Sequence, residues 1–236
     1  MSSTLSGRRA LVTGASSGIG RATARALAGE GARVALVARD RHELEDAARE
    51  LRGSVAIESD VRDPSAVDDA VRRAASDFGG LDLVVTAAGL GKFGDTATFA
   101  VEDWDEVLDV DLRGTFLVVR AALPHLRESR GHLVTISSIA AIRPFPGSAA
   151  YCAAKAGVRA LAQVVAEENR RVGVKVTNMV VGSVDSPFWE RAGGTKLARE
   201  RMLRPEDVAR AIVLAVAQPA GASLDEIVLM PPDGVL

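Results

Sequence analysis

Residues 9–20 read RALVTGASSGIG, a short apolar run that leads directly into three closely spaced glycines. The apolar run predicts a buried strand, and the three- and four-residue spacing of apolar side chains in 21–29 predicts a helix directly after the glycines. Glycine tolerates positive φ and lets a ligand approach the backbone, while the first turn of a helix offers unpaired N–H groups to an anion. The glycines therefore indicate either a phosphate-binding loop or simply a tight turn.

The rest of the chain alternates short apolar runs with helix-length segments such as 66–75 and 104–126. Strands that are apolar on both faces lie between two helix layers, and repeated strand–helix–strand units require right-handed crossovers. We therefore predict one doubly wound α/β domain over 1–236, with a Rossmann-type parallel sheet of about seven strands in a three-layer α/β/α arrangement. The predicted strands are 9–13, 33–38, 55–58, 81–86, 132–137, 175–180 and 226–229.

The composition excludes several classes of protein. With 47% hydrophobic and 25% charged residues, the chain has the balance of an ordered globular protein. A net charge of −2 gives no electrostatic attraction to nucleic acid or to an anionic membrane, and no apolar run approaches the roughly 20 residues of a membrane span. The single cysteine, Cys152, excludes an internal disulfide, and three scattered histidines do not suggest a metal site. The polar start of the chain does not resemble a signal peptide, so we expect a soluble, cytoplasmic protein without a metal.

If the glycine loop binds a dinucleotide, the residue at the end of the second predicted strand indicates which one. An acidic side chain there bonds the ribose 2′-OH of NAD, whereas a basic one accommodates the 2′-phosphate of NADP. Here Ala38 ends the strand and Arg39 follows, and a guanidinium binds phosphate through paired hydrogen bonds. Arg39 can also be an ordinary solvated charge, and Asp40 can face the ribose instead. We predict NADP(H) as the preferred cofactor with NAD(H) as the alternative, and we expect Asp60-Val61 at the same edge of the sheet.

The only tyrosine of the chain, Tyr151, precedes Lys155 by four residues in the predicted helix 148–165. Residues four apart share one helix face, with Cβ atoms about 5–6 Å apart. A free phenol has a pKa near 10, and a neighbouring ammonium lowers that pKa because it favours the phenolate. Such a phenol can exchange a proton with a substrate oxygen while a nicotinamide carries hydride. Ser138, which follows the predicted strand 132–137, is placed to hydrogen-bond the same oxygen.

Each of these features is common in isolation. A Tyr-x-x-x-Lys pair occurs by chance in many helices, and serines after a strand usually belong to turns. Taken together, their order and spacing resemble the classical short-chain dehydrogenases/reductases over almost the whole chain. The matching positions are Thr13-Gly14-x-x-x-Gly18-x-Gly20, Asp60-Val61, Ser138 thirteen residues before Tyr151, and Tyr151-x-x-x-Lys155.

The resemblance implies a role for each matching residue. Tyr151 would be the catalytic acid/base, Ser138 would orient and polarise the substrate carbonyl, and Lys155 would lower the pKa of Tyr151 and hold the nicotinamide ribose. In members that prefer NADP, the position of Arg39 contacts the 2′-phosphate. The cofactor-binding residues implied in this way are Gly14, Ser16, Ser17, Gly18, Ile19, Gly20, Arg39, Asp60, Val61, Ala88, Gly89, Tyr151, Lys155, Val184 and Ser186.

Several stretches depart from the family pattern. The family's Asn-Asn-Ala-Gly after the fourth strand is Thr86-Ala87-Ala88-Gly89 here, so two amides that brace the sheet are missing. Asp111 stands where the family has the asparagine of its proton relay. That asparagine acts largely through its main-chain carbonyl, so we count Asp111 as catalytic, and a carboxylate there would alter the electrostatics of Lys155. The family's Pro-Gly after the sixth strand is Val181-Gly182.

The substrate end of the site is expected in the loop after Ser138 and in a substrate loop at about 183–204. The residues there are mainly apolar, as in most small-molecule sites. Arg143 can clamp a substrate carboxylate, although such arginines are more often solvated or paired. The C-terminal stretch 225–232 resembles a subgroup that acts on small hydroxy acids and diverse carbonyls. The candidate substrate residues are Ser138, Arg143, Phe145, Phe188 and Trp189.

We therefore expect an NADP(H)-dependent oxidoreductase that interconverts a carbonyl and an alcohol on a small substrate by hydride transfer. Two alternatives stay open: a cofactor-binding regulatory protein with little turnover, and a structural subunit of a hetero-oligomer. Intact Ser138, Tyr151 and Lys155 favour the enzyme, while Asp111 and the altered stretch 86–89 keep the alternatives in view. The resemblance also implies a homodimer or homotetramer that pairs through the segment 104–126 and the helix of Tyr151.

Overall fold

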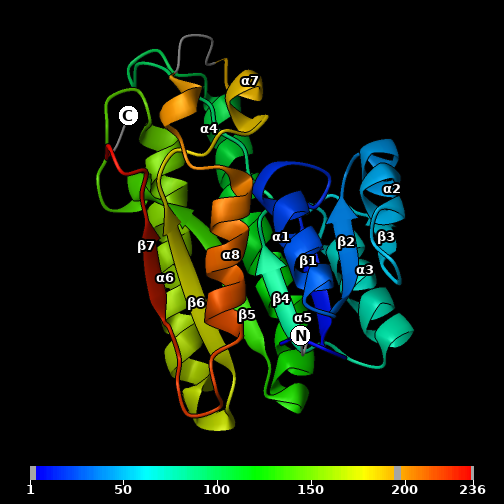
Figure 1. The fold of residues 1–236 in the computed structure, drawn as a ribbon. Coiled ribbons are helices and arrows are strands. Elements are labelled where there is room, and N and C mark those ends of the chain that lie inside the picture. Colours follow the sequence, from blue (N-terminus) through cyan, green and yellow to red (C-terminus); the bar gives the residue numbers. More distant parts are fainter. Residues whose placement is uncertain (1–3, 194–197, 235–236) are drawn as a thin grey trace.

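The computed structural model describes residues 4–193 and 198–234, so residues 194–197 of the expected substrate loop lie outside the described part. At its centre is a parallel sheet of seven strands in the order β3-β2-β1-β4-β5-β6-β7 (Figure 1). The predicted doubly wound Rossmann-type sheet is confirmed, and each strand lies within two residues of its predicted ends. The strands are β1 (Arg9–Thr13), β2 (Arg33–Ala38), β3 (Val55–Glu58), β4 (Leu83–Thr86), β5 (His132–Ser138), β6 (Lys175–Val181) and β7 (Glu226–Leu229).

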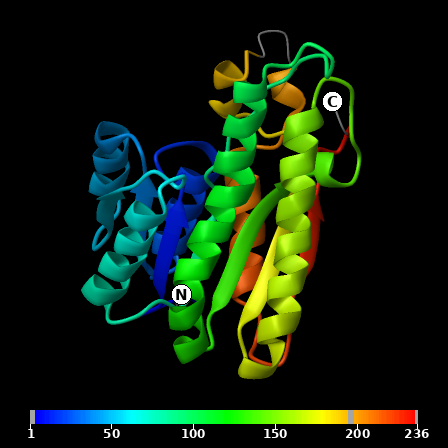
Figure 2. The ribbon, with the colours of Figure 1, turned by 180° about the vertical axis from the view of Figure 1, so that it is seen from behind.

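Helices cover both faces of the sheet and complete the three layers. One face carries α1, α2 and α8, and the other carries α3, α5 and α6, which Figure 2 shows in front of the strands. None of the helices in 4–193 and 198–234 is long and apolar enough to cross a membrane. The helices are α1 (Gly18–Gly29), α2 (Arg41–Arg49), α3 (Pro64–Phe78), α4 (Val101–Val107), α5 (Gly114–Ser129), α6 (Ala149–Asn169), α7 (Phe188–Arg191) and α8 (Pro205–Val216), with short turns η1 (Leu108–Arg113), η2 (Ile139–Ala141), η3 (Arg170–Val172) and η4 (Arg199–Arg201).

The order of the strands fixes where a ligand can bind. From β1 the chain steps outward to β2 and β3, and it then returns to pair β4 with the other side of β1. In open α/β sheets, ligands bind at such a reversal, beyond the carboxyl ends of the strands. The loops after β1 and β4 therefore meet at the expected site, and α4 and α7 both lie beyond that edge of the sheet (Figure 1).

Local capping signals act as the sequence indicates. Asp63 accepts hydrogen bonds from the first turn of α3, Pro64 occupies the start of that helix, and Gly79 ends it at a φ of 79°. Asp40 caps α2 in the same way, because its side chain accepts from the backbone N–H of Glu43 at 2.9 Å. Asp40, which the sequence offered as an alternative ligand of the ribose, thus stabilises the first turn of α2.

The helix-length segment predicted over 104–126 is helical throughout, but it is not a regular α-helix along its whole length. It is a succession of α4, the π-helical turn η1 and α5, and the π turn spans six residues, Leu108–Arg113. A π turn holds one more residue than an α turn and often marks a functional site. Apolar periodicity over six residues cannot distinguish the two, because the helix continues on both sides. At its end, Gly114 allows α5 to approach the loop after β3, since a Cβ there would lie 2.8 Å from Val61.

His132 gives the fold a defined response to pH. Its ring is buried in β5, and its Nε2 shares a hydrogen bond of 2.7 Å with the hydroxyl of Thr177 in β6. Burial, aided by the charges of Lys175 and Arg8, lowers the pKa of His132 to about 4, because a protonated ring would lose its hydration. The unfolded chain takes up that proton near pH 6.5, so the unfolded state binds more protons between the two pKa values. Stability from this group is therefore complete above about pH 6.5 and is lost as the pH falls towards 4.

We predict that acidification from about pH 7 to pH 4 costs roughly 3 kcal/mol of unfolding free energy through His132 alone. Urea unfolding of the native chain and of His132→Gln across that range measures it. The glutamine keeps a partner for Thr177 but cannot take up the proton, so its free energy of unfolding should fall less. Equal pH slopes for the two proteins would contradict the assignment, since both share all other titrating groups.

Candidate active site

A cavity of about 720 Å³ lies beyond the carboxyl ends of the central strands, with the glycine loop at one end and Tyr151 at the other. Of the predicted site residues, Asp60, Asp111 and Arg143 do not line it. Arg143 lies in an exposed part of the loop after η2. The predicted residues that do line the cavity are Gly14, Ser16, Ser17, Gly18, Ile19, Gly20, Arg39, Val61, Ala88, Gly89, Ser138, Phe145, Tyr151, Lys155, Val184, Ser186, Phe188 and Trp189.

The glycine loop is shaped so that nothing larger than glycine fits. Gly14 has a φ of 64°, and a Cβ on it would lie 2.8 Å from the main chain of Ala87 and Ala88. A Cβ on Gly20 would lie 2.2 Å from the carbonyl oxygen of Gly14. The glycine loop therefore packs closely against the loop that follows β4 and against the first turn of α1. The first turn of α1 also lines the cavity. This close backbone cradle at a helix N-terminus suits the phosphates of a dinucleotide.

Two buried hydroxyls at the cavity also fit a polar ligand. The Oγ atoms of Ser59 and Ser183 are buried, and within the described residues neither has a hydrogen-bond partner. A buried polar group without a partner costs about 1–3 kcal/mol. A dinucleotide with hydroxyl and phosphate oxygens can satisfy such groups. The sequence reasoning missed both serines, although Ser59 directly precedes Asp60 at the predicted edge.

Asp60, which was predicted to bind the cofactor, pairs with Arg62 in this structure. Its carboxylate lies 2.6 Å from the guanidinium of Arg62, and the side-chain hydrogen bond from Arg62 is the main reason that the pKa of Asp60 is lowered. The carboxylate therefore does not line the cavity. The neighbouring residues Ser59 and Val61 line it instead.

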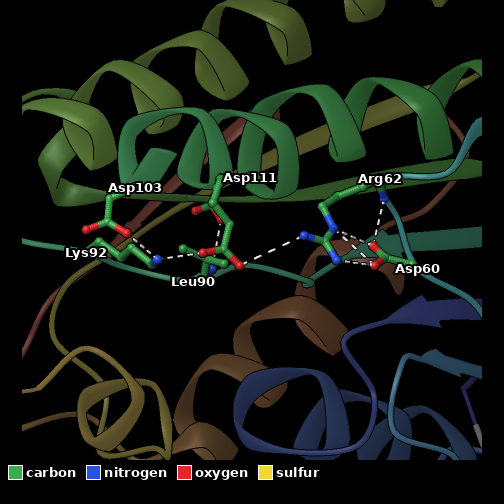
Figure 3. Close-up of polar contacts among 7 residues, drawn as sticks. Asp60, Arg62, Leu90, Lys92, Asp103 and Asp111 are labelled. Carbon is green, nitrogen blue, oxygen red and sulfur yellow. Dashed lines mark hydrogen bonds and ion pairs between the residues drawn. The ribbon is translucent and has the colours of Figure 1, made fainter. Parts of the chain in front are cut away.

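The Asp60–Arg62 pair is one end of a chain of charges (Figure 3). The guanidinium of Arg62 lies 3.9 Å from Glu106, Glu106 lies 2.6 Å from the ammonium of Lys92, and that ammonium lies 2.5 Å from Asp103. Asp103 and Glu106 belong to α4, so the loops after β3 and β4 are both tied to this helix. Partly exposed pairs contribute little individually, and the value of the chain is that it positions two loops at once.

Aromatic rings enclose Tyr151 at the substrate end. The ring centroid of Phe93 lies 5.7 Å from that of Tyr151 and 6.2 Å from those of Trp189 and Phe145. Phe188 approaches Tyr151 to 5.6 Å. Phe93, which follows the anchored Lys92, was not predicted, because nothing in the sequence of its loop indicates that the loop returns over Tyr151.

The catalytic residues predicted from the sequence lie together. Tyr151 and Lys155 share a face of α6, with the Lys155 ammonium 5.6 Å from the Tyr151 ring centroid and 3.3 Å from the carbonyl oxygen of Ile136. Ser138 ends β5 and lines the cavity beside them. Its Oγ accepts a hydrogen bond from the N–H of Ala140 at 3.2 Å, so its own hydroxyl hydrogen stays available for a further acceptor.

Asp111 lies behind these residues and meets Lys155 directly. Its carboxylate is fully buried and lies 3.0 Å from the equally buried ammonium of Lys155. The other carboxylate oxygen accepts from the N–H of Leu90 at 2.8 Å. Gly89 makes room for the pair, since a Cβ there would lie 3.3 Å from Lys155 and 3.4 Å from Asp111. The main-chain carbonyl of Asp111 accepts from the hydroxyl of Thr115 at 2.6 Å.

The loop after β4 is thus braced without the two family amides. The hydroxyl of Thr13 accepts hydrogen bonds from the N–H groups of Ala87 at 3.1 Å and Ala88 at 3.3 Å, and Asp111 holds Leu90. Both supports come from neighbouring elements, β1 and η1. Thr13 and Asp111 therefore support the loop after β4 in place of the two amides that the sequence lacks at 86–87.

The comparison with protein families agrees with this geometry. The family model described as short chain dehydrogenase matches residues 8–196. The chain belongs to the short-chain dehydrogenase family. Relatives with similar sequences are described as oxidoreductases: an uncharacterized oxidoreductase of Staphylococcus epidermidis is 37% identical over 224 residues, which cover 94% of this chain and 96% of that protein. Another, from Staphylococcus aureus strain MW2, is 36% identical over 230 residues, covering 96% and 98%.

Solved structures of short-chain dehydrogenases superpose closely on the chain. An alcohol dehydrogenase from Thermococcus sibiricus, complexed with 5-hydroxy-NADP, has a TM-score of 0.89 at 30% identity and covers 95% of this chain and 97% of its own. A 3-ketoacyl-(acyl-carrier-protein) reductase from Brucella melitensis, complexed with NADH, has a TM-score of 0.87 at 28% identity with the same coverage. The chain is thus an oxidoreductase of a family whose solved members bind nicotinamide cofactors.

The electrostatics of this short-chain dehydrogenase differ from the expectation for Tyr151. Burial raises the pKa of Tyr151, the charge of Lys155 opposes that rise, and the charge of Asp111 adds to it, with a net pKa above its ordinary value. Burial is the largest single influence on Lys155 and lowers its pKa, but the charge of Asp111, the charge of Tyr151 and the hydrogen bond to Asp111 together raise that pKa above its ordinary value. Lys155 therefore acts on Tyr151 in the expected direction, but the aromatic enclosure and Asp111 outweigh it.

We predict that Asp111→Asn lowers the pKa of Tyr151, because the change removes a buried negative charge that disfavours the phenolate. Tyr151 is the only tyrosine, so the ultraviolet absorbance of phenolate reports this residue alone during an alkaline titration. Lys155→Met is expected to move the midpoint in the opposite direction. Circular dichroism at each pH shows whether the fold persists. An unchanged or higher midpoint in Asp111→Asn would refute the electrostatic role of Asp111.

Proposed function

We propose that this short-chain dehydrogenase is an NADP(H)-dependent enzyme that interconverts a carbonyl and an alcohol on a small substrate, with Tyr151 as the acid/base. The observation that carries the proposal is the convergence of Ser138, Tyr151 and Lys155 in one cavity with the glycine loop and Arg39. A regulatory or purely structural protein has no need for a phenol at the cavity wall with a buried ammonium and a buried hydroxyl beside it, next to a dinucleotide-binding loop.

The cofactor would extend along the cavity between its two ends. The glycine loop and the first turn of α1 would hold the diphosphate, Arg39 the 2′-phosphate, and Lys155 the nicotinamide ribose. The bound cofactor supplies or accepts the hydride. Because the solved relatives include complexes with an NADP derivative and with NADH, the choice of NADP rests on this chain's own residues. Asp40 also lines the cavity, and one of its carboxylate oxygens is engaged as the cap of α2.

The chain's own residues account for the movement of the proton. During carbonyl reduction, the phenol of Tyr151 donates its proton to the substrate oxygen, and the hydroxyl of Ser138 donates a hydrogen bond that polarises the carbonyl. The ammonium of Lys155 stabilises the phenolate that remains, and Asp111 fixes the position of that ammonium. During alcohol oxidation the same phenolate removes the proton.

The substrate end favours an uncharged compound with an apolar substituent. Among the described lining residues there, Phe93, Phe145, Phe188 and Trp189 supply an aromatic wall, and the only charged side chain near Tyr151 is Lys155. Arg143 does not line the cavity, so we assign no clamp for a substrate carboxylate. Aldehydes and ketones with apolar or aromatic groups are therefore the first compounds to test.

The proposed assembly is a homodimer or homotetramer. Phe116 of α5 and Val164 of α6 leave large apolar side chains 45% and 54% exposed, on the two helices that lie side by side on one face (Figure 2). Self-association through these helices would cover both side chains.

We predict that Tyr151→Phe lowers the rate of turnover by at least about 10²-fold, because the proton donor is lost while the ring remains. Binding of NADPH should stay within a few-fold of the native value. The absorbance of NADPH, followed with a panel of apolar aldehydes and ketones, measures turnover, and intrinsic fluorescence measures binding. Native-like activity in this variant would eliminate Tyr151 as the acid/base.

We predict that Arg39→Ala weakens NADPH binding by roughly 10- to 100-fold, because a hydrogen-bonded charge is worth about 1.5–3 kcal/mol. NADH has no 2′-phosphate and should bind the variant as it binds the native chain. Fluorescence titration with each cofactor measures both dissociation constants. Arg41→Ala is the matched control, since Arg41 pairs with Glu45 and does not line the cavity. A similar loss for both cofactors would show that Arg39 does not read the 2′-phosphate.

A further inference from the structure

A second arginine reaches the cofactor end of the cavity from an unexpected element. Arg191 ends α7, which belongs to the segment that follows β6, and its side chain lines the same cavity as the glycine loop. Its Nη1 lies 3.5 Å from the hydroxyl of Ser17, and its Nη2 lies 3.7 Å from the carboxylate of Glu43. The guanidinium therefore stands between the N-terminus of α1 and the first turn of α2.

This position corresponds to the 2′ side of the adenine ribose. Glu43 lies in the first turn of α2, four residues after Arg39 at the end of β2. In dinucleotide-binding sheets, the end of the second strand is where the 2′ substituent is read. Tyr151, beside which the nicotinamide would lie, is on α6 next to β5, and β1 and β4 separate β5 from β2. A guanidinium beside Glu43 is thus placed for the 2′-phosphate.

The carboxylate of Glu43 beside Arg191 makes a positive charge favourable at this position. Glu43 lines the cavity, and its carboxylate would repel a 2′-phosphate bound by Arg39. The guanidinium of Arg191, 3.7 Å from that carboxylate, offsets its charge. Its contacts with Ser17 and Glu43 are both long, and each uses one terminal nitrogen, whereas a guanidinium presents five N–H donors in a fork that matches phosphate.

We infer that Arg191 is a second ligand of the cofactor's 2′-phosphate, facing Arg39 across the cavity. The inference rests on the proposed preference for NADP(H). It assigns to the segment after β6 a part in choosing the cofactor. Because α7 also carries Phe188, whose ring lies against Tyr151, the segment that holds the 2′-phosphate also forms the aromatic wall of the substrate end.

The test compares dissociation constants of NADPH, NADH and adenosine 2′,5′-bisphosphate, measured by fluorescence and calorimetry. We expect Arg191→Ala to weaken NADPH and the bisphosphate about tenfold or more, and to leave NADH within about threefold. Arg191→Lys should restore part of the affinity. Arg201→Ala is the matched control, because Arg201 lies in the same segment, pairs with Asp233 and does not line the cavity. Glu43→Gln should bind NADPH at least as tightly as the native chain.

The outcomes separate this inference from the proposed function. A native chain that prefers NADPH, together with an Arg191→Ala variant that keeps the whole preference, overturns the inference and leaves the proposed function standing. Equal losses for NADPH and NADH also overturn it, since Arg191 would then act on the diphosphate or on the fold. A native chain that binds NADH more tightly than NADPH overturns the proposed cofactor. The inference about Arg191 then fails too, unless Arg191→Ala weakens binding of adenosine 2′,5′-bisphosphate more than binding of adenosine 5′-monophosphate.

Discussion

The contact between the carboxylate of Asp111 and the ammonium of Lys155 holds the candidate active site together. It joins η1 to α6, and each partner makes one further hydrogen bond, to the loop after β4 and to β5. Both groups are buried: burial raises the pKa of Asp111 above its ordinary value, and the charge of Lys155 and the hydrogen bond from Leu90 oppose that rise. Removal of one partner from such a pair typically costs roughly 3–5 kcal/mol, since the remaining charge is left without compensation. Four elements of the active site are therefore positioned by one ion pair.

The same pair sets the chemical character of Tyr151. Burial among the aromatic rings raises the pKa of Tyr151, and the negative charge of Asp111 partly offsets the opposite effect of Lys155. A phenol with a raised pKa stays protonated near neutral pH, which is the form that donates a proton to a carbonyl oxygen. Asp111 thus both supports the structure and favours the form of Tyr151 that the proposed proton donation requires.

Much of this arrangement could be predicted from the sequence, and the rest depends on contacts between distant segments. Apolar runs located the strands, and the spacing of Tyr151 and Lys155 placed both on one helix face, because these are local patterns. The return of Phe93 over Tyr151 and the approach of Arg191 to Glu43 are tertiary contacts. No spacing along the chain encodes them. The π turn at η1 was missed because its six residues interrupt no apolar pattern.

That π turn makes the active site sensitive to the length of the chain. Each residue advances an α-helix by about 100°, and a π turn takes up one residue more than an α turn. A chain one residue shorter at Leu108–Arg113 can run from α4 into α5 as an unbroken α-helix, with the same strands and the same layers. The side chain presented to Lys155 would then be a different one. A single-residue insertion or deletion at this turn would therefore change the partner of Lys155 as directly as a point substitution.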